Sequence, residues 1–368
     1  MSTAFLTTRP SGPASTRGLF DAPEYARQRA FFTTHPATTP LVPLPGLAAA
    51  LGLGGLLMKD ETSRFGLPAF KSVGVEFAVH ALGQRGELAG VSTLVCASAG
   101  NHGRAVARAA RTAGLAATIF LDADVVPARV AAIASEGATV VRVPGTYDDA
   151  VREAAAHAAA SGGLVVSDTS WPGYERIPFD IMLGYTRLMD EAESSWGTEP
   201  PDLLVIQAGV GGLLAAVASW SAWRFGEARP RLVAVEPALA ACVQASARAG
   251  RPDAVAGPLT TVMAGLRCGE VSPLAFAAIA PLVDAYLAVD DDWTRATMRR
   301  LARPVGGDPP FAVGASGAAG VAALLALDED PALGGVADAL GITPATRALV
   351  IATEGVTEPE LWHEVTSR

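Results

Sequence analysis

A lysine is the first residue of this sequence that points to covalent chemistry. Only two of its 28 Lys and Arg residues are lysines, and one of them, Lys71, lies in the stretch RFGLPAFKS. Arginine stays protonated at any ordinary pH, whereas a lysine amine can lose its proton and attack a carbonyl carbon. Pro68 is typical of a first helical turn, so we expect Lys71 near the positive end of the helix dipole, where the neutral amine needed for a Schiff base is favoured. The alternative is that Lys71 is an ordinary solvent-exposed lysine of a helix. The other lysine, Lys59, lies at the end of a predicted strand beside Asp60 and Glu61, and these carboxylates would keep Lys59 protonated and paired.

A glycine-bearing turn with an asparagine follows the next predicted strand, in CASAGNHGRAVARAAR, residues 96–111. Its backbone N–H groups open a predicted helix and can hold a carboxylate or a phosphate, and Asn101 adds a side-chain amide suited to a ring hydroxyl. The candidate substrate-binding residues of this turn are Ser98, Ala99, Gly100 and His102. His102 invites assignment as a general base, but a structural role is the commoner one for a lone histidine in such a turn.

A second glycine turn lies in LLVIQAGVGGLLAAVASW, residues 203–220, between an apolar strand and a helix. Glycines let backbone amides approach a phosphate at a helix N-terminus, which makes this turn a candidate phosphate site. A dinucleotide fingerprint is the alternative, because the next predicted strand ends in Glu236, but Leu214 occupies its third glycine position. A monophosphate is the simpler ligand, and a plain strand-to-helix turn stays open. The residues of the turn are Gly209, Val210, Gly211 and Gly212.

Two hydroxyl groups near the C-terminus complete the candidate set. Thr353, in IATEGVT, follows an apolar run and could offer its hydroxyl to a buried ring nitrogen. Ser316, in GASGAAG, could act in the same way. Both could also be ordinary helix caps.

Alternating strand and helix patterns must position these turns. Short β-type runs such as STLVCAS, AATIFL, ATVVRV, DLLVIQ and RLVAVE alternate with Ala-rich amphipathic stretches, among them helices predicted to begin at Pro68, at Gly103, after Pro127 and after Asp148. This alternation predicts an α/β fold of open, twisted, mostly parallel sheets flanked by helices, with ligands beyond the carboxyl ends of the strands. Residues 1–45, rich in Pro, Thr and Ser, are predicted to form an extended arm with one short helix around APEYARQRAFF.

Composition limits the partners of the chain. At 368 residues, of which 50% are hydrophobic, it is long enough for two packed domains. A net charge of -9 argues against nucleic acid or an anionic membrane as partner, so we expect a small molecule. Cys96, Cys242 and Cys268 are too widely spaced to suggest a disulfide framework or a metal site, which fits a reducing cytoplasm. We expect neither a signal sequence nor a membrane span.

Together these motifs resemble the pyridoxal-phosphate enzymes of the tryptophan-synthase β-subunit type, known as fold type II. Within that group the sequence is most similar to diaminopropionate ammonia-lyases, through KDETSRFGLPAFK, YDDAVREAA, DTSWPGYERIPFDIMLGY, QAGVGG and TEGVT. The likeness covers most of the chain after residue 58. It implies that the cofactor, pyridoxal 5'-phosphate, lies in the cleft between a large domain, residues 1–75 and 170–368, and a small mobile domain, residues 76–169.

The resemblance also implies which residues bind the cofactor. Lys71 corresponds to the lysine that holds it as a Schiff base, and the turn from Gly209 to Gly212 corresponds to the phosphate loop. Asn101 matches an asparagine near the phenolic oxygen. Thr353 matches a hydroxyl beside the pyridine nitrogen, where a neutral group favours β-elimination over transamination.

On the substrate side, the likeness is incomplete. Asp168 matches an acidic residue suited to pairing with a substrate β-ammonium, and Tyr147 is a weaker candidate for the same pocket. Where the ammonia-lyases have an aspartate beside Gly-Asn-His, this chain has Ala99, and where they have Gly-Glu-Ser-Gly, it has Ala315 in place of the glutamate. The missing aspartate acts in the family as a base toward the D-enantiomer, so we expect D-diaminopropionate to be nearly inert.

The expected reaction is α,β-elimination of an amino acid, L-2,3-diaminopropionate or a related β-substituted alanine, to a 2-oxo acid and ammonia. Lys71 would be displaced by the substrate and would then remove the α-proton. The alternatives are a β-replacement synthase, a dehydratase of threonine or serine, and a cofactor-binding paralogue without turnover. We expect a homodimer in the cytoplasm and no metal.

Overall fold

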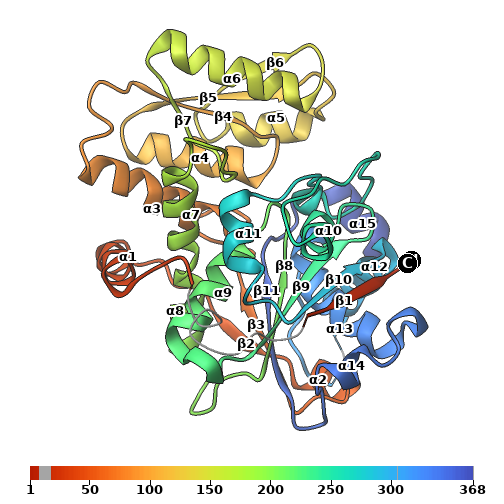
Figure 1. Ribbon diagram of the computed structural model, residues 1–368. Coiled ribbons are helices and arrows are strands. Elements are labelled where there is room, and N and C mark those ends of the chain that lie inside the picture. Colours follow the sequence, from red (N-terminus) through yellow and green to blue (C-terminus); the bar gives the residue numbers. More distant parts are fainter. Residues whose placement is uncertain (8–17, 305, 368) are drawn as a thin grey trace.

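The computed structural model describes residues 1–7, 18–304 and 306–367 and contains two β-sheets (Figure 1). The larger sheet has seven strands and the smaller sheet has four. In Figure 1 the small sheet lies at the top with its own helices, and the large sheet lies below it. The sequence-based prediction of an α/β fold with mostly parallel sheets flanked by helices is confirmed.

The large sheet is parallel in its centre and antiparallel at both edges, where β1 pairs with β10 and β2 pairs with β3. In β8, Leu203 and Val205 join one core cluster, whereas Leu204 and Ile206 join the other. Side chains that alternate between two buried faces explain why this strand reads as an unbroken apolar run. In spatial order the strands are β1 (Thr3–Leu6), β10 (Ala285–Val289), β9 (Arg231–Pro237), β8 (Leu203–Gln207), β11 (Arg347–Ala352), β3 (Gly55–Asp60) and β2 (Leu41–Pro43).

The small sheet is entirely parallel. Val95 and Phe120 pack on one of its faces against α6 (Tyr147–Ser161), while Leu94 and Ile119 belong to the main core. All its strands fall within the predicted small domain, residues 76–169, whose boundaries and mobility stay a prediction. In spatial order they are β6 (Thr139–Val143), β5 (Ala116–Asp122), β4 (Thr93–Ala97) and β7 (Leu164–Val165).

Helices cover both sheets and join them. The remaining α-helices are α1 (Ala22–Thr34), α2 (Pro45–Ala50), α3 (Lys71–Gln84), α4 (Asn101–Thr112), α5 (Pro127–Ala134), α7 (Arg176–Tyr185), α8 (Arg187–Glu193), α9 (Gly212–Phe225), α10 (Cys242–Ala249), α11 (Pro273–Ile279), α12 (Asp291–Ala302), α13 (Ala315–Glu329), α14 (Val336–Ala339) and α15 (Pro359–Thr366). Helix α13 packs across the central strands of the large sheet, and α9 packs against β8, α7 and α11. None of the helices in the described ranges has the length and hydropathy that a membrane crossing requires.

Helix α3 connects the two sheets because it packs against both α4 and α7. Glycine makes its contact with α7 possible. A Cβ atom on Gly74 would lie 2.6 Å from the Ile181 carbonyl oxygen, and one on Gly184 would lie 2.8 Å from the Gly74 Cα atom. The two helices therefore approach backbone to backbone, and the helix that begins at Lys71 is fixed to the large sheet through α7.

The predicted helix starts differ from the structure by one to three residues, most at the first helix, and part of the arm differs as well. The first helix begins at Lys71 instead of Pro68, because the Phe70 N–H donates to the Thr353 carbonyl and the Pro68 carbonyl accepts the Gly355 N–H. The second begins at Asn101 instead of at Gly103. The arm, residues 1–45, contains its predicted helix as α1, but its described residues also form strands β1 and β2, and residues 8–17 lie outside the described part.

Candidate active site

Lys71 begins helix α3 and lies close to Asp168. Its Nζ atom donates a hydrogen bond of 2.6 Å to Asp168 Oδ2. The rings of Phe70 and Tyr185 lie 5.3 and 5.9 Å from the same atom. The Phe70 N–H donates to the Thr353 carbonyl at 3.1 Å, which holds the segment before Lys71 against the end of β11. The side chains of the pair stay partly accessible, with exposed fractions of 21% for Lys71 and 19% for Asp168.

Asp168 determines the protonation state of Lys71. Burial by itself lowers the pKa of Lys71, but the Asp168 carboxylate raises it, so that the pKa lies above the ordinary value of a lysine. Burial raises the pKa of Asp168, but the Lys71 ammonium lowers it, and it lies below its ordinary value. The expectation that the helix N-terminus keeps Lys71 neutral is therefore wrong for this structure, because an adjacent carboxylate outweighs the helix dipole. The pair consists of an ammonium and a carboxylate.

Lys59 belongs to a different group of charges, which we call the buried charge cluster and which consists of Lys59, Glu61, Arg64 and Glu191. The Lys59 Nζ atom lies 2.7 Å from Glu191 Oε2 and 3.3 Å from Glu61 Oε1. Arg64 donates hydrogen bonds to the same two glutamates. The prediction that a carboxylate pairs with Lys59 is confirmed for Glu61, whereas the Asp60 carboxylate bonds to the loop that follows it.

The turn between β4 and α4 presents Asn101 to the site. Its Nδ2 atom donates a hydrogen bond of 2.6 Å to Glu354 Oε2. Before it, the Ser98 hydroxyl accepts the Gly100 N–H at 3.3 Å. No side chain of the described residues caps α4, so N–H groups of its first turn are available to an anion. Ala99, Gly100 and Asn101 line a hollow together with Glu354.

His102 lies behind this turn and contacts Asp168. It is buried, its Nε2 atom lies 3.0 Å from the Val166 carbonyl oxygen, and its Nδ1 atom lies 3.7 Å from Asp168 Oδ2. Burial lowers the pKa of His102. Because a carbonyl can only accept, the neutral ring carries its proton on Nε2, which leaves Nδ1 without a proton to donate. The structure thus places His102 beside the Lys71–Asp168 pair, and its predicted contact with substrate stays a prediction.

The second glycine turn connects β8 to α9. Gly211 has a φ of 96°, and a Cβ atom there would lie 2.8 Å from Ile279 Cδ1. A Cβ atom on Gly209 would lie 3.1 Å from the Cys268 sulfur. The Val210 carbonyl accepts the Ser272 N–H at 2.9 Å, which fixes the turn. Helix α9 begins at Gly212 without a capping side chain among the described residues, so its first N–H groups can bind an anion.

Gln207, Ser316 and Thr353 form a buried polar group under the site. Gln207 Nε2 lies 2.9 Å from the Thr353 hydroxyl oxygen and 3.0 Å from the Ser316 carbonyl oxygen, and it can donate to both. The Thr353 hydroxyl is 3.4 Å from the same carbonyl. The Ser316 hydroxyl accepts the Gly265 N–H at 2.9 Å. Neither hydroxyl acts as a simple helix cap.

The family follows from a comparison with known proteins. The profile of the family described as pyridoxal-phosphate dependent enzyme matches residues 32–342. The chain belongs to this family. The resemblance inferred from the sequence motifs is thereby confirmed.

Similar proteins of this family include diaminopropionate ammonia-lyases. The enzyme of Escherichia coli (strain K12) is 34% identical over 351 residues, which cover 89% of this chain and 86% of that protein. The solved structure of the Escherichia coli diaminopropionate ammonia lyase with an aminoacrylate-PLP azomethine reaction intermediate is 31% identical, with a TM-score of 0.89 and coverage of 100% of this chain and 97% of that chain. Its structure with D-serine is 30% identical, with a TM-score of 0.88 and the same coverage.

The residues of this pyridoxal-phosphate dependent enzyme fit the cofactor. Lys71 supplies an amine for the aldehyde of the cofactor. The uncapped N-terminus of α9, which follows the turn at Gly211, can bind its phosphate. Gln207 Oε1 and His102 Nδ1 are among the buried polar atoms that have no hydrogen-bond partner in the described part of the chain. Both belong to side chains that contact a site residue, Thr353 in one case and Asp168 in the other. The set of donors suits an aldehyde, a ring and a phosphate rather than a metal, and the described residues hold no cluster of three metal-ligating side chains.

Sequence reasoning missed Glu354 and Gln207. Each is a buried polar residue at the end of a buried apolar strand, directly after β11 and at the end of β8. A polar side chain at the carboxyl end of a central strand is the signal that could have found them, because ligands of such sheets lie there. Tyr147, a weaker candidate, begins α6, and its side chain lies outside the described part of the chain.

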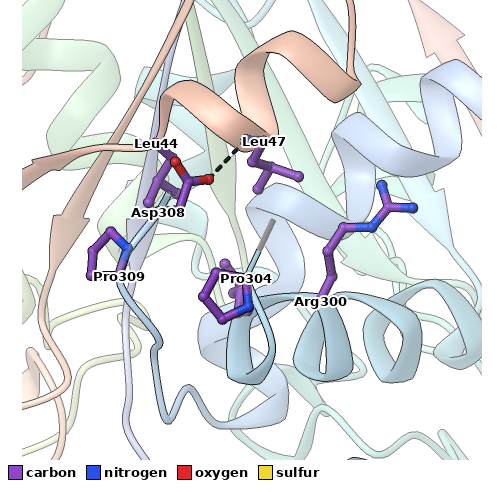
Figure 2. Close-up of a pocket in the computed structure, with 7 residues that line it drawn as sticks. Leu44, Leu47, Arg300, Pro304, Asp308 and Pro309 are labelled. Carbon is purple, nitrogen blue, oxygen red and sulfur yellow. Dashed lines mark hydrogen bonds between the residues drawn. The ribbon is translucent and has the colours of Figure 1, made fainter. Parts of the chain in front are cut away.

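Two hollows differ in what they offer a ligand. The hollow beside Asn101, called the Asn101 hollow below, holds about 500 Å3 of empty space, including open solvent. Its lining consists of Ala99, Gly100, Asn101, Arg104, Ala128, Arg129, Ala132, Ala264, Gly265, Glu354 and Thr357. Figure 2 shows the other, of about 220 Å3, where the Asp308 carboxylate accepts the Leu47 N–H at 2.8 Å and so satisfies the start of α2. None of the predicted site residues lines that second hollow.

Proposed function

We propose that the protein catalyses the pyridoxal-phosphate dependent α,β-elimination of L-2,3-diaminopropionate, or of a related β-substituted alanine, to a 2-oxo acid and ammonia. The observation that carries the proposal is the Lys71–Asp168 pair, 2.6 Å apart, in a chain 34% identical to a diaminopropionate ammonia-lyase. The Tyr185 ring lies near both Lys71 and Gly212, the first residue of α9. The amino-acid substrate would enter through the Asn101 hollow, whose lining includes one acidic residue, Glu354, and two basic ones, Arg104 and Arg129.

The residues that would hold the cofactor lie on helices and turns that are connected to both sheets. Lys71 would bind its aldehyde, and the turn from Gly209 to Gly212 would bind its phosphate. Asn101 would lie near its phenolic oxygen, and Thr353 near its ring nitrogen, with Gln207 fixing the Thr353 hydroxyl. When bound, pyridoxal phosphate withdraws electrons from the substrate α-carbon and so weakens the bond to the α-proton.

Lys71 and Asp168 would move and balance the protons. Lys71 must be neutral when it takes the α-proton, and the ammonium that results is the form that the Asp168 carboxylate stabilises. We also propose, from the resemblance, that Asp168 pairs with the β-ammonium of the substrate. Ala99 offers no second base on the other side of the substrate, so Lys71 alone would take the α-proton and the L-enantiomer would be used.

The larger organisation belongs to the same proposal. The small domain, residues 76–169, would move against residues 1–75 and 170–368 as substrate enters. The protein would be a homodimer, for which exposed apolar side chains such as Leu239 and Trp171 offer contact area. The cytoplasm is the proposed location, which three cysteines without a disulfide support.

A substrate screen tests the proposal. The purified protein, loaded with pyridoxal phosphate, is given L- and D-2,3-diaminopropionate, L-serine and L-threonine, and release of ammonia and 2-oxo acid is measured with and without an added thiol. Ammonia and pyruvate from the L-diamino acid are the expected products, and the thiol should change neither. A larger rate with L-serine or L-threonine would make the protein a dehydratase, and a thioether product would make it a β-replacement synthase.

A further inference from the structure

Glu354 is a carboxylate of the site that the mechanism above does not use. It follows Thr353 at the end of β11, and only 6% of its surface is exposed. Its side chain lines the Asn101 hollow opposite the helices that carry Arg104 and Arg129. The backbone of Glu354 pairs with that of Ala69 in an antiparallel bridge, so it is fixed beside the segment that leads to Lys71.

The partners of Glu354 are neutral. Asn101 Nδ2 donates to Oε2 at 2.6 Å, and the Ser316 N–H donates to Oε1 at 3.1 Å. Among the described residues no ion pair joins Glu354 to a cation. The two arginines of the hollow are engaged elsewhere, since Arg104 Nη2 lies 3.3 Å from a carboxylate oxygen of Glu136 and Arg129 pairs with Glu358. A buried carboxylate without a counter-ion costs free energy, and a cation in the hollow would remove that cost.

Asp168 differs from Glu354 in this respect. Its carboxylate holds the Lys71 ammonium at 2.6 Å. The two carboxylates flank the start of α4, where consecutive side chains reach them, Asn101 toward Glu354 and His102 toward Asp168. Burial raises the pKa of Glu354. The pKa of Asp168 is lowered instead, because the positive charge of Lys71 lies beside its carboxylate. Of the two, Glu354 is the carboxylate that still lacks a cation.

We propose that Glu354 is a specificity-determining residue whose carboxylate, together with that of Asp168, binds the β-ammonium of the substrate and favours it over a β-hydroxyl. The inference rests on the proposed function, since only a substrate with a β-amino group brings a second ammonium into the hollow. The carboxylate keeps this group protonated, and a protonated amine leaves as ammonia with the electron pair of the carbon–nitrogen bond. Glu354 thus supplies an acidic group near Ser316, next to the position where this chain has Ala315.

Binding of two unreactive ligands tests this inference. Neither 2-methyl-2,3-diaminopropionate nor 2-methylserine has an α-proton, so neither can be eliminated, and their dissociation constants are measured by calorimetry on the protein loaded with pyridoxal phosphate. Glu354→Gln should raise the dissociation constant of the diamino ligand by about tenfold or more and that of 2-methylserine by less than about threefold. Glu354→Asp, which keeps the charge, should retain the preference for the diamino ligand. The matched control, Glu360→Gln, removes an exposed carboxylate at the start of α15 and should change neither constant.

The possible outcomes separate the inference from the proposed function. If Glu354→Gln weakens both ligands equally, or weakens neither, Glu354 has no part in specificity. Should both Glu354 variants fail to fold, the wild-type protein decides, because equal affinity for the two ligands contradicts the inference. If the wild-type protein releases no ammonia from L-2,3-diaminopropionate, the proposed function fails. If it does, and Glu354→Gln keeps the full preference of the wild-type protein for the diamino ligand, only the inference fails.

Discussion

Lys71 and Lys59 carry the same amine in opposite surroundings. Lys71 is partly accessible and faces one carboxylate, whereas Lys59 is 1% exposed and is held by two. We expect Lys71→Ala to lose covalent attachment of pyridoxal phosphate, because no second accessible amine replaces it, and Lys59→Arg to keep it. Borohydride reduction followed by peptide mapping measures this. A label on Lys59, or on neither lysine, would contradict the assignment.

Asp168 allows a second prediction at the scale of single residues. Asp168→Asn removes the charge that faces Lys71 and, as proposed, the substrate cation, so kcat/KM for L-2,3-diaminopropionate should fall by about two orders of magnitude. Covalent attachment of the cofactor should persist, because Lys71 remains. Steady-state kinetics and the absorbance of the bound cofactor measure the two effects. Unchanged kinetics on the diamino substrate would remove Asp168 from the proposed mechanism.

The residues of the site were predictable to the extent that they occur in local motifs. Lys71, Asn101 and the glycine turn stand in short segments whose residue types suggest their chemistry. The protonation state of Lys71 was not predictable, because Asp168 is distant in sequence and approaches only in the folded chain. Glu354 was missed for a similar reason, since its neighbours Asn101 and Ser316 come from other elements.

At the scale of elements, the buried charge cluster connects β3, the loop before Lys71 and α8. Lys59 and Arg64 reach Glu191 from the end of β3 and from that loop. Burial raises the pKa of Glu191, but hydrogen bonds from Arg64 and Lys59 outweigh burial and lower this pKa to about 2. The cluster therefore fixes the chain segment that leads to the site, and Arg187, which is partly exposed, also pairs with Glu191 at 2.7 Å.

Glu191→Gln leaves Lys59 and Arg64 without part of their counter-charge and should lower the free energy of unfolding by about 3–5 kcal/mol at pH 7. A carboxyl group whose folded pKa is depressed stabilises the protein above its unfolded pKa, and this contribution is lost as the pH falls toward about 2. The difference in the free energy of unfolding between wild type and Glu191→Gln should thus become smaller by about 2 kcal/mol as the pH falls from 5 to 3. Denaturant titrations measure it. Glu193→Gln, which removes a partly exposed charge from the same helix, is the control and should cost less than about 1 kcal/mol.

In the large sheet, strands β8, β9 and β11 were predictable from the sequence, whereas the edge strands β1 and β2 and the inner strand β10 were not. The apolar runs of β8, β9 and β11 are long enough to stand out in sequence. In contrast, β1 and β2 are short and take their strand geometry from pairing with β10 and β3. The strand conformation of β1 and β2 depends on their neighbouring strands more than on their own residues. Their sequences lack the alternation of apolar and polar residues that would predict a strand.

At the scale of the whole molecule, an ion pair that involves Arg129, a residue of the Asn101 hollow, joins elements beside the two sheets. Arg129 lies on α5, beside the small sheet, and pairs with Glu358, which precedes α15 beside the large sheet. Exposed fractions of 26% and 34% make the pair sensitive to salt. If the small domain moves as proposed, this contact must open to admit substrate and form again once substrate is bound.

Arg129→Gln should raise KM for L-2,3-diaminopropionate by about two- to fivefold, because the closed arrangement loses one exposed ion pair. In wild type, added salt should raise KM toward the value of the variant, while the variant should respond little. Arg152→Gln, which removes an exposed arginine of α6, serves as the control and should leave KM unchanged. Equal salt dependence in wild type and Arg129→Gln would show that the pair has no part in closure.

The scarcity of lysine has a practical consequence. Of the two lysines, only Lys71 is accessible to an acylating reagent, since Lys59 is buried and bonded. At a pH high enough to deprotonate part of the Lys71 ammonium, a tagged ester should therefore modify one lysine only, and a bound cofactor should protect it. Intact-mass spectrometry of the acylated protein would then count the fraction of molecules whose site is filled, without any substrate and without a spectroscopic signal.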